Sequence, residues 1–413
     1  MNRRTLLHFG VFGFFGSLCG LSRDRSARAA LPIARSCIFV WLNGGPSHID
    51  TFDPKPRTKA GGPTKAIATR TKGMQLAACF AHLAERSDKF TIIRSMTSKE
   101  GNHARAQYLG HTGYAPNPTV KHPSLGSWTA NQKGDPHAEL PAFVSIGGPS
   151  YGSGFLGNAF DPLVLTKAGE RPDHTTHAPG ISAERFEKRM QALNFVDDEF
   201  VTAVPDRIAQ GRRAVVARAV ALMQSPDLAV FDLDDESAAA LAKYGDTNFG
   251  RACLLARRLI EKNTTRFVEV VLDGWDTHRD NFSKVHQLGS TLDVGLSALL
   301  DDLHAKNLLR STLVVCMGDF GRTPAINEYE GRDHHPHAWS ALVGGGTLRG
   351  GYVHGATDED GRNVVRDEVH LPDLFATLAV QLGLDPHHVA MTQAGRPIHL
   401  TDHGKPIEAL VHA

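Results

Sequence analysis

The segment Thr312-Leu313-Val314-Val315-Cys316-Met317-Gly318-Asp319-Phe320-Gly321-Arg322-Thr323 decides the fold and the place of the site. Its first six residues form an apolar run rich in β-branched side chains, which is typical of a buried strand. The run ends at Gly318 and Asp319, and Gly331-Arg332-Asp333-His334-His335-Pro336 follows after a short loop. A carboxylate that directly follows an apolar strand in the sequence is costly to bury unless it is paired or bound to a cation. The segment therefore predicts a metal or anion site at the carboxyl edge of a sheet.

Five further short apolar runs resemble this one, at residues 37–42, 90–96, 142–146, 267–272 and 340–343. Helical periodicity lies between them, most clearly at 249–262 and 284–305. Strands that alternate with helices of this length predict an α/β fold with a mostly parallel central sheet and helices on both faces. Residues 182–245 depart from the alternation, because they contain helical segments and no strand, and they predict a helical insertion.

The charge and histidine content of the chain indicate which classes of partner and site to expect. The 413 residues include 45 Lys and Arg against 44 Asp and Glu, and the basic residues are scattered. Nucleic acid is therefore not an expected partner, because no basic footprint for a phosphate backbone is present. Histidine is abundant, with 22 copies, many of them beside Asp, Gly or Asn, which favours a metal or acid–base site. No cysteine pair, dinucleotide fingerprint or haem motif indicates a redox cofactor.

Residues 1–30 read as a twin-arginine export signal. Arg3-Arg4 precedes a moderately apolar stretch that runs to Leu21, and Ala27-Arg28-Ala29 has the small-x-small pattern of a cleavage site. The alternative is a short membrane anchor, but the apolar stretch is shorter than a bilayer span. We therefore expect a single exported domain at residues 31–413, periplasmic or extracellular, with no membrane span after the signal is removed.

A second polar cluster follows the predicted strand at 37–42. It carries oxygen and nitrogen donors and two glycines: Asn43, Gly44, Gly45, His48, Asp50 and Asp53. The glycines would allow backbone N–H groups to approach an anion or metal. The structural alternative is a loop entry in which the carboxylates bind their own backbone, and it is the favoured reading for Asp53.

A third polar cluster, at residues 273–282, follows the predicted strand at 267–272. Asp276 and His278 stand two residues apart, so a turn could present both to one ion. The structural alternative is that Asp276 caps the following helix and His278 lies on the surface. Because parallel strands bring their carboxyl ends to one edge, all three clusters are expected to meet there.

Together these segments resemble an uncharacterised exported bacterial family, domain-of-unknown-function family 1501, which is grouped with the alkaline-phosphatase and sulfatase superfamily. The resemblance is carried by residues 44–55, 274–278, 314–323 and 331–334, and the expected helix at 371–384 resembles the closing helix of sulfatases. It implies an alkaline-phosphatase-like fold. It also implies strand-end Asp and His side chains that hold divalent metals, while a nucleophile attacks a sulfate or phosphate ester.

The resemblance assigns roles by position. The implied metal ligands are Asp319, His334, Asp276, His278, Asp50 and Asn43, and the implied anion-binding residues are Gly44, Gly45 and Arg322. The superfamily's nucleophile lies ten residues ahead of the glycine in an element that resembles His111-Thr112-Gly113, which puts His103 in that place. His103 or Ser98 would then serve as nucleophile or base. Phe320 occupies the place of a ligating residue of the superfamily.

The leading hypothesis is therefore an exported metal-binding protein that hydrolyses or transfers a sulfate or phosphate ester of a small molecule or polysaccharide. Mixed Asp and His ligation suits Zn, Mn or Ca. The alternative is a non-catalytic relative that binds an extracytoplasmic polysaccharide or a partner protein. Phe320 in a ligand's place and the lack of the usual hydroxyl nucleophile favour that alternative.

Overall fold

The six apolar runs of the sequence all form strands of one nine-stranded sheet. The computed structural model describes residues 34–203 and 207–412, so the predicted export signal lies outside the described residues. The sheet has the order β12-β4-β11-β8-β1-β7-β5-β6, and β15 pairs with β4. Its strands are β1 (Ser36–Leu42), β4 (Phe90–Thr97), β5 (Phe143–Ile146), β6 (Leu163–Leu165), β7 (Phe267–Leu272), β8 (Thr312–Gly318), β11 (Trp339–Gly344), β12 (Tyr352–His354) and β15 (Val369–His370).

The sheet is mostly parallel, as predicted, with β11 as the exception. β1 pairs in parallel with both β7 and β8, whereas β11 is antiparallel to both β4 and β8. The reason lies in the connection between β8 and β11, because residues 319–338 contain no helix that could carry the chain back for a parallel crossover. The start of β11 therefore lies at the same edge as the carboxyl ends of β4, β1, β7 and β8.

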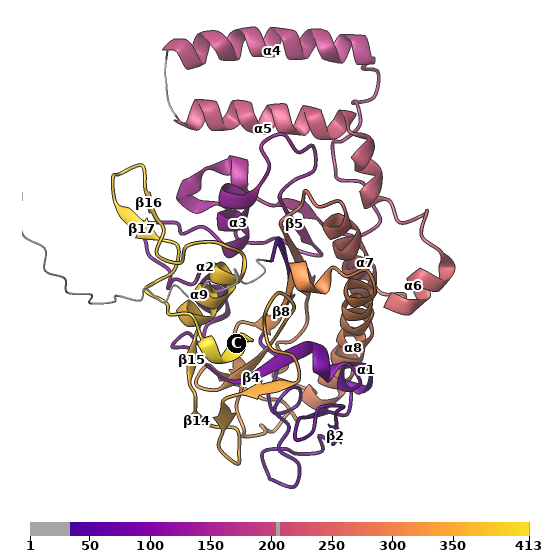
Figure 1. The fold of residues 1–413 in the computed structure, drawn as a ribbon, viewed down its shortest axis with the longest axis vertical. Coiled ribbons are helices and arrows are strands. Elements are labelled where there is room, and N and C mark those ends of the chain that lie inside the picture. The colour runs from indigo at the N-terminus through magenta and orange to yellow at the C-terminus, as the bar shows by residue number, and fades with distance from the viewer. Residues whose placement is uncertain (1–33, 204–206, 413) are drawn as a thin grey trace, which may run out of the picture. The chain divides into compact units, whose positions relative to one another are not determined.

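Helices cover both faces of the sheet, which Figure 1 shows with α7 and α8 on one side and α9 on the other. Alternate residues of β1 point to opposite faces. Val40 belongs to the apolar core beneath α7 (Asn248–Glu261) and α8 (Asn281–Ala305), and Phe39 belongs to the core beneath α9 (Leu371–Gln381). β1 is therefore buried on both sides, as is its neighbour β8, which explains their continuous apolar sequences.

The predicted helical insertion is present. It contains α4 (Ala183–Ala203), α5 (Arg207–Gln224) and α6 (Ala238–Tyr244), with a 3-10 segment at Pro226–Phe231. The other helices are α1 (Ala81–Ala84), α2 (His103–Thr112) and α3 (Leu125–Lys133). Short two-stranded ribbons complete the fold: β2 (Ala66–Ala68) with β3 (Gln75–Ala77), β9 (Gly321–Arg322) with β10 (His334–His335), β13 (Ala356–Thr357) with β14 (Val364–Arg366), and β16 (Val389–Met391) with β17 (Pro397–His399).

Within residues 34–203 and 207–412, no helix combines the length and the apolar character that crossing a bilayer requires.

Candidate metal centre

Three histidines and one aspartate from distant parts of the sequence meet at the carboxyl edge of the sheet. His103 begins α2, which follows β4, and Asp276 and His278 lie in the loop after β7. His334 lies in β10, which pairs with β9 directly after β8 and precedes the antiparallel β11. The strand order places all of these connections side by side, so the topology assembles the cluster.

The ligand atoms of this cluster are close together. His103, Asp276 and His334 offer atoms that lie within 4.8 Å of one another. Oδ1 of Asp276 lies 3.4 Å from Nε2 of His103, 3.4 Å from Nε2 of His334 and 3.1 Å from Nε2 of His278. The two Nε2 atoms of His278 and His334 are 2.9 Å apart. The three imidazoles therefore present the same ring nitrogen to one carboxylate oxygen.

The other ring nitrogen of each imidazole, Nδ1, lies within hydrogen-bond distance of an oxygen atom. Nδ1 of His103 lies 2.6 Å from Oδ2 of Asp319, and Nδ1 of His278 lies 3.0 Å from Oδ1 of Asp333. Nδ1 of His334 lies 2.8 Å from the carbonyl oxygen of Gly101. An oxygen acceptor at Nδ1 favours a proton on that atom, which leaves the Nε2 lone pair free to bind a metal.

This arrangement fits a divalent cation. With protons on Nδ1, the facing Nε2 lone pairs of His278 and His334 repel one another at 2.9 Å, and either a proton between the two rings or a bound cation relieves that repulsion. Nε2 of His103 is buried and has no hydrogen-bond partner among the described residues. Imidazole nitrogen together with a carboxylate oxygen is a donor set that zinc and similar ions take. His103, Asp276 and His334 would hold the ion, and His278, whose Nε2 lies 3.1 Å from Oδ1 of Asp276, is the nearest further donor.

Arg322 keeps Asp276 ionised and in place. Burial alone would raise the pKa of Asp276, but the hydrogen bond and charge of Arg322 outweigh it and lower that pKa to about 2. Nη2 of Arg322 lies 2.6 Å from Oδ1 of Asp276, and the guanidinium also donates to the carbonyls of Gly44, Gly45 and Arg332. Arg322 is completely buried. The structure therefore does not leave it open for the predicted anion-binding role.

Asp319 supports a histidine in this arrangement, whereas the resemblance had implied a metal ligand. It is fully buried, and its bond to Nδ1 of His103 raises the pKa of that imidazole. Carboxylates in this position orient a histidine and strengthen it as a ligand. The neighbouring Phe320 packs its ring 4.8 Å from that of His103 and 4.6 Å from that of His334, so an apolar wall lies beside the cluster.

Asp50 is not brought to the cluster. Its carboxylate is almost completely buried and pairs with Arg332, with 2.6 Å from Nε to Oδ2 and 3.2 Å from Nη2 to Oδ1. Ser47, Thr64 and Asn281 donate further hydrogen bonds to it. This set of donors occupies both carboxylate oxygens, which leaves them unsuited to the metal-ligand role predicted for Asp50.

Asn43 and Ser98 also lie apart from the ligand atoms. Asn43 donates to Oδ1 of Asp273 at 2.9 Å and accepts from Gln107 at 2.8 Å. Oγ of Ser98 accepts the backbone N–H of Glu100 at 3.0 Å. Both side chains hold loops around the site, so His103 is the one predicted catalytic residue that the structure places in the cluster.

Residues 34–411 match a family of proteins of unknown function, DUF1501. The chain belongs to this family.

No curated protein sequence matches this DUF1501 chain. Solved structures similar to it include Ps i-CgsB in complex with k-i-k-neocarrahexaose, with 11% identity, a TM-score of 0.42, and coverage of 86% of this chain and 72% of that one. A protein in the alkaline phosphatase superfamily from Vibrio parahaemolyticus has 12% identity, a TM-score of 0.37, and coverage of 86% and 69%. The C-terminal periplasmic domain of EcEptC from Escherichia coli, complexed with Zn, has 10% identity, a TM-score of 0.41, and coverage of 93% and 96%. No residue role is carried over from likenesses this distant.

The glycines after β1 serve close packing in the DUF1501 chain. Gly44 has φ +108°, and a Cβ there would come within 2.5 Å of the backbone nitrogen of Asp276. Gly45 has φ +76°, and a Cβ there would come within 3.0 Å of Oδ1 of Asp319. The carbonyls of both glycines accept from Arg322. The pair therefore lets the loop after β1 touch the loops after β7 and β8, a role other than the anion binding predicted for it.

Replacing Gly44 with alanine is expected to destabilise the fold and weaken metal binding together. A non-glycine residue in this conformation costs about 1–3 kcal/mol, and the Cβ also displaces the backbone of Asp276. Gly73→Ala is the matched control, because Gly73 has φ +84° but no atom within 4 Å of a Cβ. Urea unfolding and zinc titration of both variants measure the effect. Equal losses in the two variants would contradict the proposed packing against Asp276.

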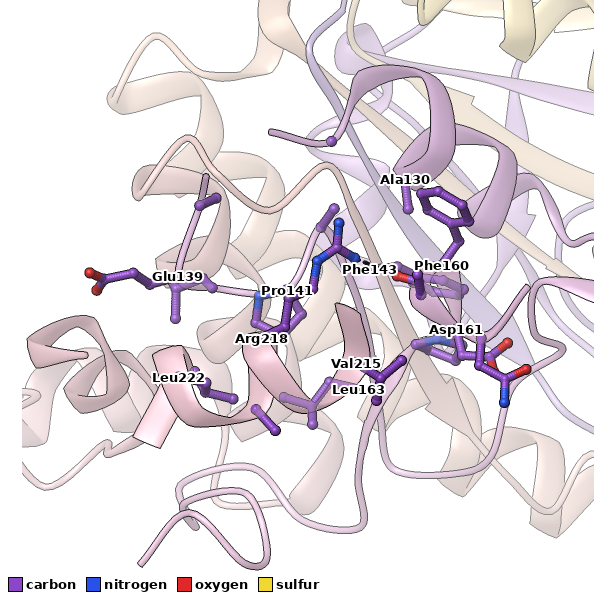
Figure 2. Close-up of a pocket in the computed structure, with 18 of the residues that line it drawn as sticks. Ala130, Glu139, Pro141, Phe143, Phe160, Asp161, Leu163, Val215, Arg218 and Leu222 are labelled. Carbon is purple, nitrogen blue, oxygen red and sulfur yellow. Dashed lines mark hydrogen bonds between the residues drawn. The ribbon is translucent and has the colours of Figure 1, made fainter. Parts of the chain in front are cut away.

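This DUF1501 protein has a cavity of about 470 Å³, and Figure 2 shows residues that line it. It is lined by Pro141 and Phe143 at the amino end of β5, by Leu163 in β6, and by Val215 and Arg218 of α5. His103, Asp276 and His334 do not line it. The cavity adjoins the amino ends of β5 and β6, whereas the cluster lies at the carboxyl edge of the sheet.

Proposed function

We propose that this chain is an exported, metal-dependent hydrolase of sulfate or phosphate esters, with one divalent ion held by His103, Asp276, His334 and His278. The observation that carries the proposal is the convergence of three Nε2 atoms on Oδ1 of Asp276, each imidazole being held through Nδ1. Three imidazole nitrogens and a carboxylate oxygen brought this close together form a donor set that a divalent cation can bind.

A divalent ion in this cluster would polarise an ester oxygen and lower the pKa of a water molecule that it binds. The chain's own residues prepare the site. Asp319 and Asp333 fix the tautomers of His103 and His278, and Arg322 holds Asp276 as a carboxylate. The His103, His278 and Asp276 side chains are 26%, 43% and 47% exposed, so an ester at the surface can reach them. This exposure suits a small-molecule ester and also one carried by a polysaccharide.

His103 would bind the metal, and a water molecule would attack the ester. No serine, threonine or cysteine is among the residues that bond to the ligand atoms of the cluster in the described part of the chain. Imidazole that donates through Nδ1 to Asp319 and binds a metal through Nε2 has no free nitrogen for covalent catalysis. The export route through a twin-arginine signal suits a protein that folds around its metal before it crosses the membrane.

The test combines metal analysis with turnover. We expect the purified mature protein to contain one zinc or manganese ion per chain and to hydrolyse aryl sulfates or aryl phosphates. Asp319→Asn should weaken metal affinity about 10–100-fold, the range observed when an outer carboxylate partner of a ligating histidine is changed. Asp88→Asn is the control, because the Asp88 side chain is 48% exposed and pairs with Lys89, away from the cluster.

The hydrolase and the non-catalytic metal protein predict different results in this test. Stoichiometric metal with no turnover on either ester panel would contradict hydrolysis. That result would favour a non-catalytic metal protein that binds a polysaccharide or partner, a reading that the Phe320 ring beside His103 and His334 supports. A metal-free protein would contradict both the hydrolase and the non-catalytic metal protein.

A further inference from the structure

One face of α2 is bonded to three neighbouring strands. His103, Gln107 and His111 share this face because they are spaced at four residues. His103 bonds to Asp319, which directly follows β8 in the sequence. Gln107 bonds to Asn43, which directly follows β1. His111 bonds to Glu269 within β7. β8, β1 and β7 are consecutive in the sheet. The helix therefore makes one polar contact just after β8, one just after β1 and one within β7.

The contact between His111 and Glu269 is the most deeply buried of the three. The His111 and Glu269 side chains are 5% and 1% exposed, and Nε2 of His111 lies 3.1 Å from Oε1 of Glu269. Nδ1 of His111 lies 2.7 Å from the carbonyl oxygen of Gln107, and Ser150 donates to the second oxygen of Glu269. Every polar atom of the pair is satisfied, although neither residue touches the metal ligands.

The surrounding packing allows little movement of this part of α2. The His111 ring lies 4.2 Å from the ring of Trp41 in β1 and 4.9 Å from that of Tyr151. Gly110 lies directly against Trp41, because a Cβ at Gly110 would come within 2.6 Å of the indole. Rotation of the helix about its axis would break the His111–Glu269 contact and press α2 into Trp41.

We propose that the His111–Glu269 pair is a positioning device that sets the rotation of α2 and thereby aims His103 at the metal. This inference rests on the metal centre proposed above. His103 lies eight residues before His111, which is about 12 Å along a helix. Because a helix of this length moves as a rigid rod, an error in rotation at His111 appears as an error in the direction of the His103 imidazole. His111 and Glu269 are thus positioning residues with no contact to substrate.

The experiment compares His111→Ala, Glu269→Ala and Glu269→Gln with His122→Ala in the full chain. His122 is the matched control, because it is also a buried histidine bonded to α2, with Nδ1 2.9 Å from the hydroxyl of Tyr108, but it contacts no strand end of the site. Zinc affinity is measured by competition with a chelator, the Co²⁺ absorption spectrum reports coordination, and thermal unfolding of the metal-free protein reports stability.

We expect His111→Ala and Glu269→Ala to weaken zinc affinity by about tenfold, the lower end of the range for residues that bond directly to a ligand, and to change the Co²⁺ spectrum. Glu269→Gln retains an acceptor for His111, so it should bind zinc with wild-type affinity and give the wild-type Co²⁺ spectrum. His122→Ala should lower stability and leave zinc affinity and the spectrum unchanged.

Two results would overturn the inference, and they are distinguishable. Wild-type protein that binds zinc, with Glu269→Ala binding equally well and giving the same Co²⁺ spectrum, would show that the pair only stabilises the fold. Wild-type protein that binds neither ion would remove the metal centre itself and the positioning role with it.

Discussion

His334→Ala will abolish tight metal binding and leave the protein folded. The side chain supplies one of the converging Nε2 atoms, 3.4 Å from Oδ1 of Asp276, and is 26% exposed, so little apolar packing is lost. Loss of a direct ligand should exceed the roughly 10–100-fold cost of changing an outer partner. Ester hydrolysis should disappear with the metal. Isothermal titration with Zn²⁺ and circular dichroism measure the two quantities.

His337→Ala provides the control for that prediction. His337 lies three residues later, is exposed, and packs its ring against His335 away from the ligand atoms. The His337→Ala variant should bind zinc with the affinity of the wild type. Equal zinc affinity in His334→Ala and His337→Ala would contradict the ligand set, whatever the activity of either variant.

Asp50→Ala will produce the largest loss of stability. Arg332 is completely buried, and Asp50 supplies its only carboxylate partner among the described residues. Removing one partner of a buried ion pair costs about 3–5 kcal/mol, because the other charge remains in the protein interior. The carbonyls of Ala60, Thr323 and Pro324 still accept from Arg332, but they do not neutralise its charge. Urea unfolding of the metal-free protein measures the loss.

Asp198→Ala is the matched control for Asp50. Asp198 also pairs with an arginine, Arg213, but it is 59% exposed, so its removal should cost less than about 1 kcal/mol. Folded Asp50→Ala protein should still take up one ion per chain at saturating metal. Lost metal binding with unchanged stability would instead identify Asp50 as the ligand that the sequence resemblance implied.

The strands were predictable because burial on both faces leaves a continuous apolar run, as in residues 37–42 and 312–317. The meeting of Asp276, His278 and His334 was predictable for a related reason, since each adjoins a strand end. The direction of β11 was not predicted. It depends on the absence of a helix between residues 319 and 338, which sets where His334 lies relative to the sheet edge.

Whether a carboxylate binds the metal or supports another residue depends on its contacts in three dimensions, which the neighbouring residues in the sequence do not reveal. Asp50 and Asp276 look alike in the sequence, yet Asp50 meets Arg332, 282 residues away, and Asp276 meets three histidines. Asp319 follows a strand as a ligand would, but it contacts Nδ1 of His103. A ligand and the residue that supports it share the same chemistry, so only three-dimensional contacts separate them.

The most direct measurement of the central claim is anomalous scattering at the zinc absorption edge from crystals of the zinc-loaded protein. The account predicts a single peak bounded by Nε2 of His103, His278 and His334 and by the carboxylate of Asp276, with Asp319 and Asp333 on the Nδ1 side of their histidines. Absence of a peak at this position, or a peak bound directly by Asp319 or Asp50, would contradict it.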